Sequence, residues 1–221
     1  MPTWNEEAIR RALKLYFIMG SVNCRSAAAP AEVLREAIRG GITLFQYREK
    51  GAGALTGEAM LALGAELRDI CRASGIPFIV NDDIELAIAL DADGIHIGQD
   101  DAPADEIRRR VGEGRIVGVS AHTIEEARKA IADGADYLGI GPIYPTSSKD
   151  DAKPVQGTRL LEKLAANGIR IPLVGIGGIT TANAGEVMRG GADGISIISA
   201  IAAAGSPAEA AHELLAAVQR P

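Results

Sequence analysis

DADGIHIG (residues 91–98) returns in related form as GADYLGIG (134–141) and GADGISII (191–198). The three segments share one pattern, in which the exit from a helix leads directly into a short apolar run. Such a run is typical of a buried parallel strand. This repeated passage from helix to strand predicts that the two kinds of element alternate along the chain. Such alternation builds α/β folds around a parallel sheet.

Eight apolar runs of this kind are spread over the 221 residues. They are LYFIM (15–19), TLFQYR (43–48), PFIVN (77–81), DGIHIG (93–98), RIVGVS (115–120), DYLGIG (136–141), IPLVGIG (171–177) and DGISII (193–198). The amphipathic stretches between them mostly end in glycine, which readily adopts the left-handed conformation found just past a helix. These glycines are Gly40, Gly75, Gly112, Gly134, Gly168 and Gly190. Eight strand–helix units in about 200 residues predict an α/β fold of the (β/α)8 or TIM-barrel type.

The barrel is expected to fill residues 15–221, with residues 1–14 as a short extra N-terminal helical extension of the same single domain. A helix within residues 4–13 is placed to plug the lower mouth of the barrel. A doubly wound open sheet is the alternative fold. That fold normally carries a glycine-rich dinucleotide fingerprint after its first strand, and the sequence MGSVNC (19–24) is not such a fingerprint.

The composition argues against several classes of protein. A net charge of −6 disfavours binding to nucleic acid or to an anionic membrane, and no stretch approaches the roughly 20 apolar residues of a membrane span. The run at 15–19 follows basic residues but is shorter than the roughly 7–15 apolar residues of a secretory signal. Cys24 and Cys71 are too few for a disulfide framework and lack metal-ligand spacing, which favours a reducing, cytoplasmic location.

The chemistry of a TIM barrel lies where its strands end and the following loops begin. The second strand leads into Gln46, Arg48 and Lys50, which share one side of the strand if it continues that far. Two inward cations would be costly without an anionic partner, so this spacing indicates an anion-binding role. The alternative is that both cations reach solvent beyond the strand.

Carboxylates follow the next two strands. The third strand ends in Asn81-Asp82-Asp83, and the fourth leads to Asp100-Asp101. Either group could simply cap the helix that follows it. Taken together, two neighbouring strand ends with carboxylates could supply oxygen ligands to Mg²⁺, which typically binds one or two carboxylates together with substrate phosphates and water.

The loops after the last three strands are suited to phosphate. GPIYPTSSK (141–149) combines hydroxyls and a lysine with two prolines, although a mobile surface loop would have a similar composition. The glycines of GIGGIT (175–180) let backbone N–H groups approach an anion, and Ile198-Ser199 ends the eighth strand. A phosphate site after strands seven and eight recurs in this fold. Ordinary turn chemistry is the alternative.

Two histidines stay without a defined role. His96 lies in the middle of the fourth strand, where a hydrogen-bonded core histidine is the ordinary case. His122 follows Ser120 at the end of the fifth strand, and it suits either a helix cap or an acid/base group.

The motifs at the strand ends resemble, in order and position, those of the thiamine-phosphate synthase (thiamine-phosphate pyrophosphorylase) family. They are QYREK (46–50), VNDD (80–83), HIGQDD (96–101), GVSAH (118–122), GPIYPTSSK (141–149), GIGGIT (175–180) and SIISA (196–200). The resemblance implies a transferase of thiamine biosynthesis (EC 2.5.1.3). Such an enzyme joins 4-amino-2-methyl-5-hydroxymethylpyrimidine diphosphate to a thiazole phosphate, which gives thiamine phosphate and pyrophosphate.

The resemblance also implies roles for single residues. It implies contacts to the pyrimidine and its diphosphate from Gln46, Arg48, Lys50, Asn81, Ser120 and Lys149, of which Arg48, Lys50, Ser120 and Lys149 are the catalytic residues. It implies Mg²⁺ binding by Asp82 and Asp101, and contacts to the thiazole phosphate from Thr146, Ser148, Gly178, Ile198 and Ser199. Ser148 stands where threonine is more frequent in the family, and the hydroxyl is retained.

The expected reaction is a largely dissociative substitution. Mg²⁺ and the cations would stabilise the departing pyrophosphate, the thiazole nitrogen would capture a pyrimidine-methylene cation, and closure of residues 142–151 would exclude water. One alternative is a thiazole tautomerase on the same barrel, and a second is a non-catalytic barrel that binds a phosphorylated metabolite. Asp82 and Asp101 argue against both, because neither needs a metal-bound leaving group. The expected partners are small molecules, and association into a homo-oligomer stays open.

Overall fold

The computed structural model describes residues 4–24, 29–148 and 154–219. Its strands form one closed parallel barrel in which each strand pairs with the next and β8 pairs with β1. The strands are β1 (Leu15–Met19), β2 (Leu44–Tyr47), β3 (Phe78–Asn81), β4 (Gly94–Ile97), β5 (Ile116–Ala121), β6 (Tyr137–Ile140), β7 (Leu173–Ile176) and β8 (Gly194–Ile197). The TIM-barrel prediction is confirmed, and the open sheet is wrong.

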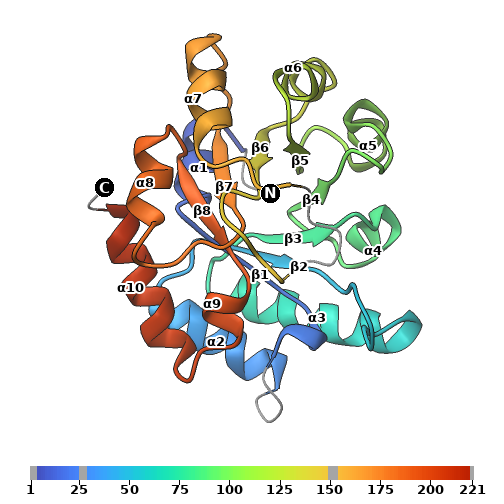
Figure 1. Ribbon diagram of the computed structural model, residues 1–221. Helices are drawn as coiled ribbons and strands as arrows, with labels where there is room; N and C mark the ends of the chain where they lie inside the picture. The colour runs from blue at the N-terminus through green and yellow to red at the C-terminus, as the bar shows by residue number, and fades with distance from the viewer. Residues whose placement is uncertain (1–3, 25–28, 149–153, 220–221) are drawn as a thin grey trace.

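Most of the helices form an outer ring around the strands (Figure 1). The helices of the described residues are α1 (Glu6–Ala12), the 3₁₀ turn η1 (Ser21–Asn23), α2 (Pro30–Gly40), α3 (Gly57–Ala73), α4 (Ile84–Ala89), α5 (Ala104–Val111), α6 (Ile124–Ala132), α7 (Arg159–Ala166), α8 (Ala184–Arg189), α9 (Ser199–Ala202) and α10 (Pro207–Gln219). Within the described ranges, none of these helices is both long and apolar enough to cross a membrane.

Alternation along the strands divides the apolar side chains into two clusters. Phe17 and Phe45 belong to the larger cluster, which lies between the strands and the outer helices. Tyr16 and Ile18 belong to the smaller cluster, which fills the interior of the barrel. Consecutive residues of β1 therefore serve opposite faces, so every strand carries one face for packing and one for the interior.

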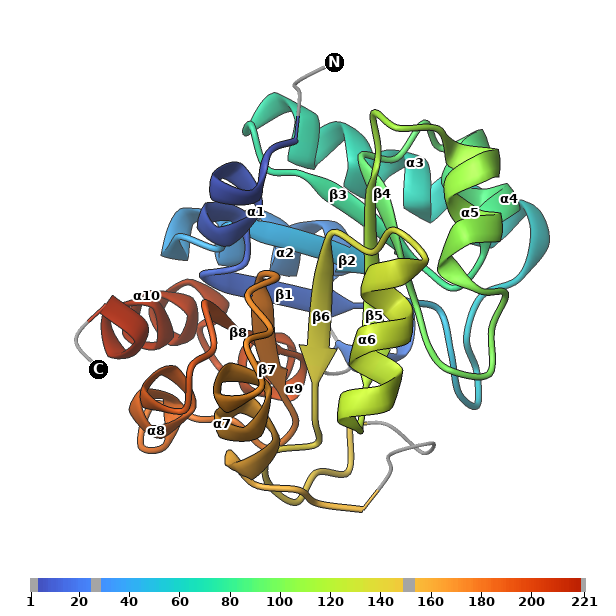
Figure 2. The same ribbon diagram turned by 90° about the horizontal axis from the view of Figure 1, so that it is seen from above.

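Helix α1 closes the lower end of the barrel. Its Ile9 and Ala12 are buried in the interior cluster together with Leu13. Asn5 begins the helix by accepting a hydrogen bond from the backbone N–H of Ala8 at 2.8 Å. Figure 2 shows α1 and the loop after β6 on opposite sides of the strands. The predicted N-terminal helix is confirmed, and the loops after the strands are left open on the other side.

The left-handed residues at two helix exits differ from the prediction by one position. The positive φ angles belong to Gly41 (98°) and Gly191 (107°) rather than to Gly40 and Gly190. Gly40 is the last residue of α2, and a Cβ there would lie 2.3 Å from the carbonyl oxygen of Ala208 in α10. Gly40 therefore allows α2 and α10 to pack closely, and Gly41 makes the turn.

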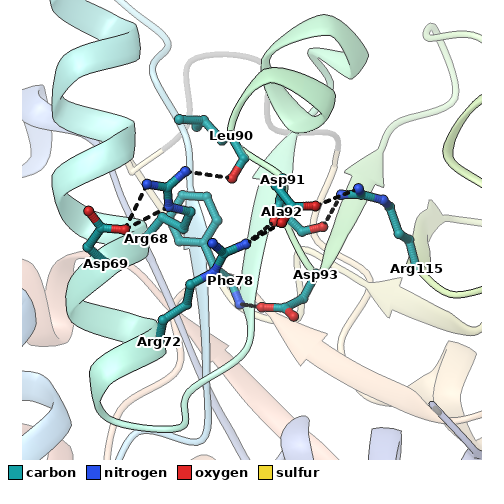
Figure 3. A network of polar contacts seen from close by, with 9 residues as sticks. All are labelled: Arg68, Asp69, Arg72, Phe78, Leu90, Asp91, Ala92, Asp93 and Arg115. Carbon is teal, nitrogen blue, oxygen red and sulfur yellow. Dashed lines mark hydrogen bonds and ion pairs between the residues drawn. The ribbon is translucent and has the colours of Figure 1, made fainter. Parts of the chain in front are cut away.

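A two-point clamp joins each even-numbered strand to the strand before it. The backbone N–H of Asp93 donates to the carbonyl of Phe78 at 2.9 Å, and its carboxylate accepts from the Phe78 N–H at 2.8 Å (Figure 3). The same two bonds join three further pairs, which are Thr43 with Leu15, Asp136 with Val117 and Asp193 with Leu173. The clamps explain why DADGIHIG recurs in related form as GADYLGIG and GADGISII, because each of these three segments supplies the aspartate of one clamp.

Arginines surround these clamps at the lower rim. Arg10 of α1 contacts Asp193 at 2.5 Å, and Arg108 contacts Asp136 at 2.5 Å. Near the Asp93 clamp, Asp91 lies between Arg72 and Arg115, at 2.7 and 2.8 Å (Figure 3). The hydrogen bond from Arg72 and the charge of Arg115 lower the pKa of the Asp91 carboxyl. This rim stabilises the barrel and leaves the opposite rim for chemistry.

Candidate active site

A cavity of about 240 Å³ opens at the carboxyl ends of the strands, with walls from β2 to β8 and the loops that follow them. A smaller cavity of about 10 Å³ lies in the barrel interior and is lined by Tyr16, Gln46 and Val174, among others. His96, Ser120 and the other shared lining residues make the small cavity the floor of the large one. The arrangement suits small molecules rather than a polymer.

Gln46 of β2 and the residues Arg48 and Lys50 just after this strand lie at two depths of the site. Gln46 is 1% exposed and lines the floor, whereas Arg48 and Lys50 line the larger cavity above it. The predicted common side of these three residues is confirmed. Arg48 is buried, which contradicts the alternative for this residue. Lys50 is exposed to solvent, as the alternative expected, and also forms an ion pair with Asp82.

The two aspartates after β3 have different roles. Asp83 caps α4, because its carboxylate accepts from the backbone N–H of Leu86 at 2.9 Å. Asp82 adopts a left-handed conformation with φ 59°, and its N–H donates to the carbonyl of His96 at 2.8 Å. Asp82 lines the cavity next to Asn81. The capping role and the site role are both present, on adjacent residues.

Asp82 and Asp101 form a carboxylate pair across two strand ends. The Asp101 carboxylate accepts from the N–H of Gly98 at 2.7 Å, which holds it in the loop after β4. Burial raises the pKa of Asp82, the nearby Asp101 raises it further, and Lys50 acts in the opposite direction. Two carboxylates that disfavour each other's charge fit a divalent cation, which would relieve the repulsion.

The donor set matches the preference of Mg²⁺. Among the residues that the structure describes, no group of three or more His, Cys, Asp or Glu side chains could hold a metal ion by itself. Mg²⁺ usually needs only one or two carboxylates, since substrate phosphates and water complete its six ligands. Asp82 and Asp101 therefore fit an ion that arrives with a diphosphate.

The loop after β6 is attached to β7. The N–H groups of Ile143 and Tyr144 donate to the carbonyls of Ile176 and Gly177, at 2.8 and 3.0 Å. Gly178 has φ 61°, and a Cβ there would lie 2.4 Å from the carbonyl oxygen of Pro145. A glycine is needed at this position because the two loops approach so closely.

Hydroxyl groups from the loops after β6 and β8 meet beside Gly178. The Ser148 hydroxyl donates to the Ser199 hydroxyl at 2.9 Å, and the Ser148 N–H donates to Thr146 Oγ1 at 3.2 Å. Ser199 opens the short extra helix α9, directly after Ile198. All five residues line the cavity, so the predicted grouping for a phosphate is present. Lys149 lies outside the described residues.

The two uncertain histidines are placed by their partners. Glu126 accepts from the backbone N–H of His122 at 2.6 Å and lies 3.2 Å from its Nδ1, so this histidine is bonded to the first turn of α6 from the position just before the N-cap Thr123, and it also lines the cavity. His96 is 8% exposed, with Nδ1 2.9 Å from the hydroxyl of Tyr137 and Nε2 2.9 Å from that of Ser120. The prediction of a hydrogen-bonded interior histidine is confirmed.

The comparison with known proteins decides the family. The family described as thiamine monophosphate synthase matches residues 15–201, which include all eight strands. The chain belongs to this family. The resemblance seen in the strand-end motifs is thus confirmed.

Related thiamine-phosphate synthases match nearly the whole chain. The chain is 58% identical to the enzyme of Geobacillus kaustophilus over 211 residues, which cover 96% of this chain and 94% of the relative. Identity to the Bacillus cereus enzyme is 56% over 216 residues, which cover 98% and 97%. Among solved structures, the thiamine phosphate pyrophosphorylase from Pyrococcus furiosus has a TM-score of 0.83 and 37% identity, with coverage of 96% and 98%.

In this member of the thiamine-phosphate synthase family, the barrel interior also contains buried polar residues that the sequence did not single out. Tyr16 and Ser196 line the cavity floor beside Gln46 and His96, and Tyr137 contacts Tyr16 and His96 from the barrel interior. The available signal for the two tyrosines was a hydroxyl-bearing residue inside the mainly apolar runs LYFIM and DYLGIG. A tyrosine in a strand is ordinarily core, so its side of the strand must be known before a site role can be assigned.

Proposed function

We propose that this protein joins 4-amino-2-methyl-5-hydroxymethylpyrimidine diphosphate to thiazole phosphate, with release of pyrophosphate. The observation that carries the proposal is one cavity with two unlike polar groups at its opposite sides. The carboxylate pair Asp82 and Asp101 lies beside Lys50 after β2 to β4, and the hydroxyls of Ser148 and Ser199 lie after β6 and β8. Two phosphorylated substrates in one cavity need such a division.

The β2 to β4 half is proposed to hold the diphosphate. A bound Mg²⁺ supplies positive charge that stabilises the departing pyrophosphate. Arg48 and Lys50 contribute fixed positive charge where negative charge develops, in a cavity that keeps them partly out of water. Asn81 offers an amide beside them, and the family resemblance adds Lys149. Asp82 and Asp101 are the residues that would hold the ion.

The β6 to β8 half is proposed to hold the thiazole phosphate. Thr146, Ser148 and Ser199 supply hydroxyl donors, and Gly178 supplies backbone with no side chain in the way. Ile198 adds an apolar contact from the cavity wall. This set is neutral, so it binds a phosphate monoester through hydrogen bonds and does not compete with the opposite half for the metal.

The bond change needs no protein nucleophile. The carbon–oxygen bond to pyrophosphate breaks, both electrons leave with the pyrophosphate, and the thiazole nitrogen donates the pair that forms the new carbon–nitrogen bond. Cys24 and Cys71 are free thiols, and neither is among the residues that line the described cavity. The chain's own residues therefore act by binding, orientation and charge stabilisation.

The two alternatives are less well supported. A thiazole tautomerase or a phosphometabolite-binding barrel has no use for the Asp82–Asp101 pair beside two cations. The related proteins that match nearly the full chain are named thiamine-phosphate synthases.

Product analysis with both substrates tests the proposal. With Mg²⁺ present, thiamine phosphate and pyrophosphate should form in equal amounts, and chelation of the metal should stop both. Tight binding of thiazole phosphate without either product, at saturating Mg²⁺ and both substrates, would instead establish a binding protein.

A further inference from the structure

A chain of hydrogen bonds crosses the barrel interior from Gln46 to Ser120. Gln46 Nε2 donates to the Tyr16 hydroxyl at 2.6 Å, and the Tyr16 and Tyr137 hydroxyls are 2.9 Å apart. The Tyr137 hydroxyl lies 2.9 Å from His96 Nδ1, and His96 Nε2 lies 2.9 Å from Ser120 Oγ. The five residues come from β2, β1, β6, β4 and β5, and we refer to them as the interior relay.

One direction of the relay gives every hydroxyl proton an acceptor. Burial raises the pKa of Tyr16 and of Tyr137, so each hydroxyl keeps its proton. Either tyrosine can donate in the bond between them, but Gln46 already donates to Tyr16, so the Tyr16 proton reaches an acceptor of the relay only if Tyr16 donates to Tyr137 and Tyr137 donates to His96 Nδ1. In this arrangement His96 carries its proton on Nε2 and donates to Ser120 Oγ. The Ser120 hydroxyl keeps its own proton for another acceptor.

Both ends of the relay face the cavity. Gln46 Oε1 is buried at the floor without a hydrogen-bond partner among the described residues, and the same holds for the hydroxyl of Ser196. Ser120 lines the floor and the larger cavity above it. Buried polar atoms in folded proteins are nearly always paired, so these atoms indicate a polar ligand that reaches the floor.

Glycines make room for the relay. A Cβ on Gly118 would lie 2.0 Å from Cζ of Tyr137, so the tyrosine ring reaches the barrel centre only because β5 has no side chain there. A Cβ on Gly139 would lie 3.1 Å from Cε1 of His96. The rings of His96 and Tyr137 stack with centroids 5.5 Å apart, which further restricts the histidine.

We propose that Tyr16, Tyr137 and His96 are positioning residues that present Gln46 Oε1 as an acceptor and the Ser120 hydroxyl as a donor to the aminopyrimidine substrate. The proposal rests on the proposed function, because an aminopyrimidine carries an amino group that donates and ring nitrogens that accept. The relay couples the two contacts. Reversal of its direction would turn Ser120 into an acceptor and remove the match to the substrate.

The ring nitrogens of His96 give a direct test, because NMR distinguishes a protonated imidazole nitrogen from an unprotonated one. The whole protein, labelled with ¹⁵N-histidine, has three histidines, and His122→Gln and His212→Gln assign the other two signals. The expected result is a single neutral tautomer at His96 with the proton on Nε2. A proton on Nδ1 would overturn the proposed direction, and this measurement needs no variant of the relay.

Kinetics test the positioning role with a matched pair of variants. Tyr137→Phe breaks the relay, whereas Tyr47→Phe removes the hydroxyl of another buried tyrosine, which donates to the carbonyl of Met60. Tyr137→Phe should lower kcat/KM for the pyrimidine diphosphate about tenfold, the usual effect of one lost hydrogen bond. It should leave KM for thiazole phosphate unchanged and allow both His96 tautomers. Tyr47→Phe should change neither the kinetics for the two substrates nor the His96 tautomer.

The experiments distinguish a failure of the proposed function from a failure of the relay proposal. Wild-type protein that forms no product would overturn the proposed function. Active wild-type protein in which Tyr137→Phe and Tyr47→Phe behave alike would overturn the relay and leave the proposed function standing.

Discussion

Lys50 forms an ion pair with Asp82 at the upper rim of the barrel, whereas the adjacent Asp83 points its carboxylate at the first turn of α4. One residue step therefore separates a group of the cavity from a helix cap. This contrast provides an internal control for the proposed metal site, because both positions carry the same side chain on the same loop.

Asp82→Ala and Asp101→Ala should lower turnover roughly hundredfold or more at limiting Mg²⁺, since loss of one stabiliser of developing charge typically costs that much. Binding of thiazole phosphate should be nearly unchanged, because the ion is proposed to belong to the diphosphate half. Steady-state kinetics across a Mg²⁺ titration and calorimetric binding of thiazole phosphate measure the two effects.

Asp83→Ala is the matched control for that experiment. It should cost about 1 kcal/mol of the free energy of unfolding through loss of the helix cap, with the Mg²⁺ dependence of turnover unchanged. An equal loss of Mg²⁺ dependence in Asp83→Ala, or full activity of Asp82→Ala at limiting Mg²⁺, would contradict the assignment of the ligands.

The lower-rim clamps give a prediction about stability. Asp136→Ala removes the acceptor of the Val117 N–H and the partner of Arg108, so it should lower the free energy of unfolding by about 2–4 kcal/mol. The exposed pair of Asp105 and Arg109 is the comparison, and Asp105→Ala should cost under about 0.5 kcal/mol. Urea unfolding of both variants measures the difference, and similar midpoints would show that the clamp contributes little.

Hydroxyl removal tests the division of the cavity. Thr146→Val and Ser148→Ala should each raise KM for thiazole phosphate by the equivalent of about 1–2 kcal/mol, the value of a hydrogen bond to a charged group. Thr158→Val is a matched control, because Thr158 Oγ1 contacts Glu162 at the start of α7, outside the cavity. A change in KM for the pyrimidine diphosphate, with none for thiazole phosphate, would assign the loop to the other substrate.

The strand-end residues were predictable because two regularities coincide. Apolar runs fix where each strand ends, and the barrel brings all those ends to one rim. This is why Arg48, Lys50 and Asp82 could be grouped from the sequence alone, and the structure places them in one cavity. The sequence could not decide whether Asp82 or Asp83 caps α4, because either carboxylate can reach a helix N-terminus and only the backbone conformation selects one.

The interior relay was not predictable for a different reason. Tyr16 and Tyr137 have the hydrophobicity and strand positions of core residues, and their partners come from strands far apart in the sequence. Hydrogen bonds between such positions depend on strand register, which a single sequence does not determine. The turn after α2 was mispredicted for another reason. Gly40 and Gly41 can both adopt a positive φ, so the sequence does not show which of them makes the turn, and in the structure it is Gly41.

The order of bond breaking and bond making gives the last prediction. If pyrophosphate leaves before the thiazole attacks, the pyrimidine methylene carries substantial positive charge in the transition state. Replacement of the pyrimidine methyl group by trifluoromethyl withdraws electrons strongly from that ring and adds the bulk of three fluorines without a new hydrogen-bond donor. Contacts from Gln46 and Ser120 should then be almost unaffected, whereas the chemical step should slow by orders of magnitude, the pattern of an effect confined to the transition state.

Single-turnover rates for the two pyrimidine substrates, at saturating thiazole phosphate and Mg²⁺, make this comparison without interference from product release. Substrate affinity is measured separately, so that a loss of binding is not mistaken for a slower step. A direct displacement places less positive charge on the methylene carbon and should tolerate the replacement. A rate change within roughly tenfold, which corresponds to about 1.4 kcal/mol of barrier, would therefore rule out the dissociative path.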